Sequence, residues 1–245
     1  MFSIFKKKVY LVDLIEGITD FHNHILPGID DGAKNIEESL QLIKAFAEIG
    51  IKDFVATPHV IGDYYPNTPQ TISQAYQNLK KNLVDPENTR INYAAEYMMD
   101  QHFMDITEGD NILPVCNGKV LVEMSYFQPP LNLNEILFKL QNNSFSPILA
   151  HPERYVYYHS KNLSKYADLK SRGCEFQLNM LSLTGHYGAG IQKTAFQLLE
   201  NNHIDYICSD VHRLDHIDKI KNIKVPKKFV DNIKVVLDKN LGLFN

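Results

Sequence analysis

Short apolar runs rich in β-branched residues alternate with helix-periodic stretches along most of this chain, and this alternation most strongly restricts its fold. We expect strands within residues 18–25, 53–57, 91–97, 119–123, 147–150, 174–178 and 204–208. Between them, apolar residues recur every three or four positions, which predicts amphipathic helices. Repeated strand–helix units favour parallel strands. We therefore predict an α/β fold with a seven-stranded barrel, and an open doubly wound sheet is the alternative.

Local signals mark where several helices begin and end. Asn35 can cap a helix that carries Glu38 three residues later, and Gly50 can end it. Thr68 followed by Pro69 is typical of a second helix start. These signals place the first two helices directly after the first two predicted strands.

The chain shows no internal repeat, low-complexity tract or linker, so we expect a single domain over residues 1–245. Its parts are an amino-terminal extension at 1–17, a barrel at about 18–212 and a C-terminal helical segment at 213–245. The helical segment carries several lysines, which predict a solvated face or a surface for an acidic partner.

Composition excludes several classes of protein. No apolar stretch approaches the roughly 20 residues of a membrane span. The basic cluster Lys6–Lys8 lacks the apolar region of a signal peptide, so we expect a cytoplasmic protein. The net charge of −4 argues against nucleic-acid binding. The three cysteines are scattered, which argues against a disulfide framework or a thiolate zinc site.

A histidine pair stands at the end of the first predicted strand. Side chains two apart in a strand point to the same side, so His22 and His24 can chelate one cation. Two partly buried structural imidazoles are the alternative. Six more imidazole or carboxylate side chains fall at the ends of later strands: His59, Glu96, Glu123, His151, Asp210 and His212. In a barrel, all eight converge on one rim.

This set of donors predicts a chemistry. Imidazole and carboxylate ligands without thiolate suit zinc, manganese or iron. Eight donors exceed what one ion uses, so we predict a site for two or three divalent metal ions. Closely spaced metals stabilise the attacking and leaving oxygens of an in-line displacement. Hydrolysis of a phosphate ester is therefore the expected reaction.

Two further residues are candidates for catalysis. Arg154 follows His151 by three residues and can bind phosphate oxygens with its guanidinium, or it can be a surface arginine paired with Glu153. Asp31 can be a metal ligand or an acid that protonates the leaving group. The alternative for Asp31 is a structural role, because Asp30-Asp31-Gly32 is also a good turn sequence.

Together these motifs resemble a known family. They stand at 20–33 (Asp-Phe-His-Asn-His through Asp-Asp-Gly-Ala), 56–59 (Ala-Thr-Pro-His), 121–123 (Leu-Val-Glu), 149–154 (Leu-Ala-His-Pro-Glu-Arg), 182–185 (Ser-Leu-Thr-Gly) and 209–212 (Ser-Asp-Val-His). The combination is similar to the PHP-domain (polymerase and histidinol phosphatase) superfamily. More narrowly, it resembles the bacterial protein-tyrosine phosphatases of capsule and exopolysaccharide clusters, the CpsB/CapC type.

The resemblance implies a distorted seven-stranded (β/α) barrel, the PHP fold, with a trinuclear site. Manganese is the favoured ion, and iron, zinc or magnesium are alternatives. The resemblance also divides the ligands among three ions. His22, His24 and Asp210 would hold the first ion, and Glu96 would bridge it to a second ion held by Glu123 and His151. His59 and His212 would hold the third ion, with Asp31 as an optional ligand. By the same resemblance, Arg154 grips the phosphate and Asp31 assists catalysis.

The implied substrate is phosphotyrosine on the tail of a tyrosine kinase encoded with the polysaccharide genes. Aromatic residues after the ligand strands, such as Phe127, Tyr155 and Tyr187, can wall a pocket for the phenyl ring or be ordinary packing. A small-molecule phosphatase of the histidinol-phosphate kind is one alternative function. A metal-bound scaffold that binds the kinase tail without turnover is another. An amidohydrolase fits less well, because that class often places lysine where this chain has Glu123.

Overall fold

The computed structural model describes residues 9–107, 111–160 and 162–244. Its strands are β1 (Val9–Tyr10), β2 (Thr19–Asp20), β3 (Asp53–Ala56), β4 (His59–Val60), β5 (Arg90–Tyr93), β6 (Glu96–Met98), β7 (Lys119–Glu123), β8 (Ser146–Ala150), β9 (Glu175–Asn179), β10 (Tyr206–Cys208) and β11 (Lys224–Val225). Its helices are α1 (Ile36–Ala47), α2 (Pro69–Lys81), α3 (Gln101–Ile106), α4 (Leu133–Asn142), α5 (Ser164–Ser171), α6 (Ala189–Glu200), α7 (Leu214–Ile220) and α8 (Val230–Leu243). Short 3-10 helices lie at Leu11–Asp13, Pro152–Arg154, Val156–Tyr158, Met180–Leu183 and Lys227–Phe229.

The strands β2 to β10 pair in parallel and follow the order of the chain. One sheet has the order β10-β9-β8-β7-β6-β4, and the other has the order β2-β3-β5. A parallel bridge between Asn23 and Val211 joins the segments that follow β2 and β10, and the His24 N–H donates to the Val211 carbonyl at 2.9 Å. The α/β fold predicted from the sequence is confirmed.

The strand predicted at 91–97 is divided into β5 and β6, and a short strand that was not predicted, β4, follows β3. These two breaks divide the strands into two sheets. Pro58 separates β3 from β4 and has no N–H to contribute to a ladder. The backbone contact continues across the break, because Ala94 N–H donates to Ala56 and Glu96 N–H donates to Pro58, at 2.8 and 3.0 Å. After the break, His59 and Glu96 are directly paired residues of β4 and β6 in the six-stranded sheet.

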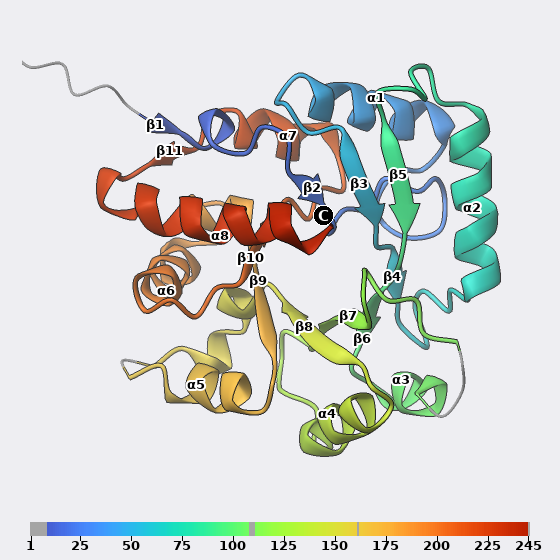
Figure 1. The fold of residues 1–245 in the computed structure, drawn as a ribbon. Helices are drawn as coiled ribbons and strands as arrows, with labels where there is room; N and C mark the ends of the chain where they lie inside the picture. The colour runs from blue at the N-terminus through green and yellow to red at the C-terminus, as the bar shows by residue number, and fades with distance from the viewer. Residues whose placement is uncertain (1–8, 108–110, 161, 245) are drawn as a thin grey trace, which may run out of the picture.

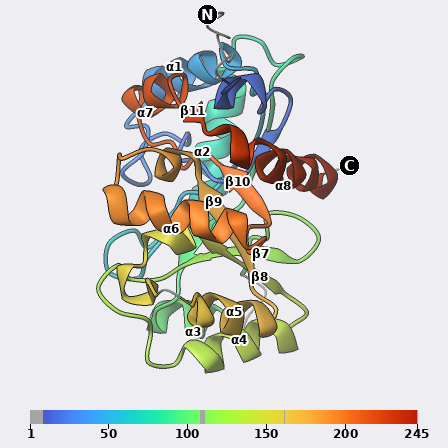
Figure 2. The ribbon, with the colours of Figure 1, turned by 90° about the vertical axis from the view of Figure 1, so that its left-hand side faces the viewer.

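The helices lie around the outside of the strands (Figure 1). Asn35 caps α1 as predicted, since its side-chain oxygen accepts the Glu38 N–H at 2.9 Å. Thr68 caps α2 in the same way, with Pro69 in the first turn. The helix α7 packs beside α1 at one end of the molecule (Figure 2). Among the described residues, no helix is both long and apolar enough to cross a bilayer.

A compact apolar cluster fills the space enclosed by the strands. Phe21, Val55, Leu121, Ile148 and Cys208 are among its buried members. Strand residues two apart share a face. Two residues beyond Leu121, on the same face of β7, is Glu123, and two residues beyond Cys208, just past the end of β10, is Asp210. The apolar interior therefore ends where the polar strand ends begin.

The C-terminal segment is not helical throughout, so the prediction of one helical segment at 213–245 is wrong in detail. The strand β11 separates α7 from α8 and pairs antiparallel with β1, with Val225 opposite Val9. Pro226 follows β11 directly and favours the extended backbone there. The described part of the predicted extension, from residue 9 onward, thus packs on the domain, with Leu11 and Ile15 fully buried. Residues 1–8 lie outside the described ranges.

Candidate metal centre

The two histidines of the first motif converge with Asp210. His22 Nε2 and His24 Nε2 lie 3.3 and 3.4 Å from Asp210 Oδ1. Both imidazoles are fully buried. The strand β2 ends at Asp20, and the Asn23–Val211 bridge then holds the histidine segment against the segment after β10. These three side chains form one group that can hold a metal ion.

Glu96 lies in the middle of the cluster and contacts four histidines, one of them His24, whose Nε2 lies 3.5 Å from Glu96 Oε2. Its Oε1 lies 3.2 Å from both His22 Nε2 and His151 Nε2. Its Oε2 lies 3.0 Å from His59 Nδ1, which is also 3.0 Å from Glu123 Oε1. His22, Glu96 and His151 form a second group that can hold an ion, and His59, Glu96 and Glu123 form a third.

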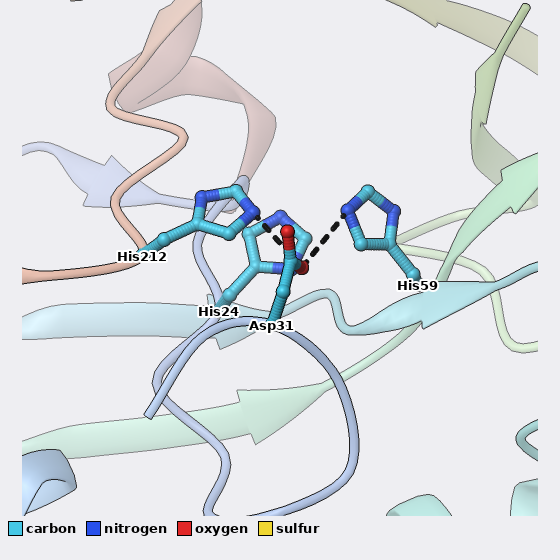
Figure 3. Close-up of side chains that lie close together, drawn as sticks. All are labelled: His24, Asp31, His59 and His212. Carbon is cyan, nitrogen blue, oxygen red and sulfur yellow. Dashed lines mark ion pairs between the residues drawn. The ribbon is translucent and has the colours of Figure 1, made fainter. Parts of the chain in front are cut away.

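A fourth group opens toward the surface. The Asp31 Oδ1 atom lies 3.5 Å from His59 Nε2 and 3.4 Å from His212 Nε2, and His24 lies beside them (Figure 3). The Asp31 side chain is 53 % exposed, whereas the His24 side chain is buried. Asp31 therefore stands at the solvent edge of the cluster.

The structure brings all eight predicted ligands together, with a division that differs in part from the one expected. His22, His24 and Asp210 meet as expected, and so do His59, His212 and Asp31. Glu123 lies nearer to His59, at 3.0 Å, than to His151, at 4.0 Å.

Unpaired polar atoms test whether these residues fit metal ions. Six buried nitrogen or oxygen atoms of the cluster have no hydrogen-bond partner among the described residues: Nε2 of His22 and His24, Nδ1 of His59 and His151, Oε2 of Glu96 and Oε1 of Glu123. A buried polar atom without a partner is costly. Imidazole and carboxylate atoms that face one another without hydrogen bonds are the donor set of a divalent-metal site. The residues therefore fit such ions.

The electrostatics of the cluster favour ionised carboxylates. Burial alone would raise the pKa of Glu96, but His22 and His59 hold it well below its usual value. Burial would likewise raise the pKa of Asp210, and His22, His24 and His212 lower it well below the usual value. Burial would lower the pKa of His59, whereas Glu123 and Glu96 raise it well above the usual value. The carboxylates are therefore ionised, and a proton that the raised pKa favours on an imidazole must leave when a metal ion binds that nitrogen.

Two of the candidate ligands have strained backbones. His151 has φ +36° and Asp210 has φ +52°, in the left-handed region that non-glycine residues rarely adopt. Strain of this kind persists where surrounding contacts hold it, and it concentrates at functional sites. Here it turns both side chains toward the cluster just after β8 and β10 end.

Two residues that orient the ligands did not stand out in the sequence. Gln177 Oε1 lies 2.7 Å from His22 Nδ1. Asp30 Oδ2 lies 2.7 Å from His24 Nδ1. Each contact leaves Nε2 of the histidine facing the cluster. Gln177 lies inside a predicted strand, and Asp30 in a turn sequence, so neither position carried a signal of its own.

Arg154 reaches the rim of the cluster from the 3-10 helix at Pro152–Arg154. Its Nη1 donates to Asp210 Oδ2 at 2.9 Å, so its ion-pair partner is Asp210 rather than Glu153. The Glu153 side chain is buried and accepts the Asn179 N–H at 3.0 Å. The alternative of a surface arginine paired with Glu153 is therefore wrong.

Known proteins share this sequence pattern and fold. Tyrosine-protein phosphatase YwqE of Bacillus subtilis is 27 % identical over 225 residues, which cover 91 % of this chain and 85 % of YwqE. Tyrosine-protein phosphatase CpsB of Streptococcus pneumoniae is 25 % identical over 242 residues, which cover 89 % of this chain and 98 % of CpsB.

A solved structure shows that the fold is shared as well. It is described with YwqE from Bacillus subtilis and CpsB from Streptococcus pneumoniae as metal-dependent tyrosine phosphatases. It matches with a TM-score of 0.77 at 24 % identity, covering 93 % of this chain and 91 % of that one. Residues 18–231 match the family described as capsular polysaccharide synthesis, CpsB/CapC. The chain therefore belongs to the CpsB/CapC family.

Proposed function

We propose that this chain is a metal-dependent protein-tyrosine phosphatase. The observation that carries the proposal is the convergence of eight imidazole and carboxylate side chains, with six unpaired buried atoms among them, beneath an arginine at the rim. A cluster of this kind suits phosphate-ester hydrolysis. The names of the relatives in the family supply the substrate class, phosphotyrosine in proteins.

The ligands proposed are His22, His24, His59, Glu96, Glu123, His151, Asp210 and His212. We propose two or three divalent ions, with manganese favoured. Bound there, such ions supply positive charge for the phosphoryl group and activate water at neutral pH. Gln177 and Asp30 keep the two central imidazoles oriented toward this site.

Arg154 is proposed to bind the phosphate oxygens of the substrate. Its guanidinium is fixed at the rim by Asp210, and a guanidinium can bind two oxygens at once. It would thereby orient the phosphoryl group and offset the negative charge on its oxygens during transfer.

Asp31 has two possible roles at the exposed edge, as a ligand between His59 and His212 or as an acid toward the leaving group. The tyrosine phenolate has a solution pKa of about 10, so its departure needs little acid catalysis. We therefore favour the role as a ligand.

The partner we propose is a phosphotyrosine-bearing tyrosine kinase of a polysaccharide gene cluster. The family description of capsular polysaccharide synthesis supports this choice. The histidinol-phosphate and scaffold alternatives become outcomes of the test.

The test is phosphate release from a phosphotyrosyl peptide, a matched phosphoseryl peptide and histidinol phosphate, with manganese added. We expect strong preference for the phosphotyrosyl peptide, and its loss in His22→Ala. The matched control is His203→Ala. His203 lies before β10, whereas the candidate ligand Asp210 follows the opposite end of that strand. Preference for histidinol phosphate would assign a metabolic phosphatase. No turnover in a metal-loaded sample would favour the scaffold.

A further inference from the structure

Two tyrosine rings contact the guanidinium of Arg154. The Arg154 Cζ atom lies over the Tyr126 ring, 4.6 Å from its centroid, and over the Tyr187 ring, 4.3 Å from its centroid. Both distances are within the range of a cation–π interaction. Asp210 forms an ion pair with the same guanidinium, so three side chains contact this one group of Arg154.

The three contacts come from three separate parts of the chain. Tyr126 follows β7 and Tyr187 precedes α6, whereas Asp210 follows β10. The Tyr187 hydroxyl accepts a hydrogen bond from Asn179 Nδ2 at 3.1 Å, and the same amide donates to Asp210 Oδ2 at 2.8 Å. The Tyr126 ring lies 5.8 Å from the His151 ring, centroid to centroid. Both tyrosines are therefore connected to ligands of the candidate metal centre.

An arginine held only by an ion pair retains freedom about its side-chain torsions. An aromatic ring that stacks on the guanidinium restricts rotation about these torsions. Its cation–π contact stabilises the guanidinium in the position that it has in the structure. An arginine ordered before the substrate arrives loses less entropy when it binds phosphate. The two rings therefore act on phosphate binding through Arg154.

We propose that Tyr126 and Tyr187 are positioning residues that hold Arg154 at the rim in the orientation from which it binds the substrate phosphate. This inference rests on the proposed function. It differs from both sequence-based expectations for Tyr187, which were a wall of a pocket for the phenyl ring of the substrate or ordinary packing. Tyr126 had no role in either expectation.

The test is a set of double-mutant cycles in the manganese-loaded full chain, with a phosphotyrosyl peptide as substrate. We expect Tyr126→Leu and Tyr187→Leu each to lower kcat/KM by about tenfold. Tyr126→Phe keeps the ring and should retain most of the activity. In the Arg154→Ala background, the leucine substitutions should have almost no further effect, because the group on which they act is gone.

Two kinetic outcomes would overturn the proposal. A leucine substitution that costs as much with Arg154→Ala as with Arg154 present would place the ring against the substrate itself. Loss of activity in Tyr126→Phe equal to that in Tyr126→Leu would assign the effect to the hydroxyl. Tyr126 is 41 % exposed, so its substitution tests the idea with little effect on the core.

A measurement without turnover separates this inference from the proposed function. In the metal-free chain, nitrogen-15 relaxation of the Arg154 Nε–H group should show more motion in either leucine variant than in the unaltered chain. Arg172 is the matched control, because it lies on the surface after α5 and pairs with Asp168. Unchanged Arg154 order in both variants would refute the positioning role. An unaltered chain that releases no phosphate would instead refute the proposed function.

Discussion

The Oδ2 atom of Asp30 lies 2.7 Å from Nδ1 of His24. The same oxygen accepts the backbone N–H of His59 at 3.2 Å, and Oδ1 accepts the Gly32 N–H at 2.9 Å. One buried carboxylate thus orients an imidazole of the cluster, holds the start of β4 and closes the turn that carries Asp31.

Asp30→Ala should weaken metal binding without removing a ligand. Loss of the carboxylate frees the His24 ring to rotate and to change tautomer, and changes of this kind typically cost about 10- to 100-fold in metal affinity. Calorimetric titration of the metal-free chain with manganese checks this. Asp63→Ala is the control, because Asp63 is exposed in the loop after β4. Equal affinities of the two variants would contradict the role given to Asp30.

Metal removal should lower the melting temperature. Without cations, the buried carboxylates of Glu96, Glu123 and Asp210 share one cluster in which only imidazole protons and the Arg154 guanidinium offset their charge. An ion at about 100 times its dissociation constant adds about 2.7 kcal/mol to the free energy of unfolding. Calorimetry with and without a chelator measures the shift, which should be smaller in His22→Ala. A chelator that strips the ions but leaves the melting temperature unchanged would count against the site.

The stability of the metal-free chain should fall between pH 4.5 and about 7. Burial raises the pKa of Glu153 to about 7, although hydrogen bonds from Ser182 and from the Asn179 backbone oppose the rise. In that window the folded state binds more protons than the unfolded state, so its stability decreases as the pH rises.

Glu153→Gln should remove this part of the pH dependence, which amounts to about 3 kcal/mol at most. Urea unfolding at pH 5 and at pH 8 measures it. Glu87→Gln, on the exposed surface before β5, should keep the original dependence. The same pH slope in Glu153→Gln and in the unaltered chain would show that another group titrates.

Gly32→Ala should disturb the site through packing alone. A Cβ atom at position 32 would overlap the backbone oxygen and the Cβ of His24, so the ligand would have to move. We expect phosphate release to fall by at least about tenfold, because small misplacements of catalytic groups are costly. Gly185→Ala is the control, since a Cβ there meets no atom within 4 Å. Full activity in Gly32→Ala would show that the turn can shift freely.

Much of the local structure was predictable from the sequence because its causes are local. The cap of α1 depends on Asn35 and Glu38, three residues apart, and the start of α2 depends on Thr68 and Pro69. The strand β7 has the bounds expected of it. The C-terminal segment was predicted as one helix because β11 exists through its pairing with β1, more than 200 residues away in sequence. Pairing of this kind leaves no periodic signal.

The alternation of strands and helices, the family, and the eight candidate metal ligands at strand ends could all be recognised in the sequence alone. These follow from short-range patterns and from motifs of a few residues. Which of the candidate ligands meet became clear from the fold, because strand pairing sets which side chains lie opposite one another. That pairing places His59 directly opposite Glu96. The contact of Gln177 with His22, and those of Tyr126 and Tyr187 with Arg154, likewise join residues that are distant in sequence.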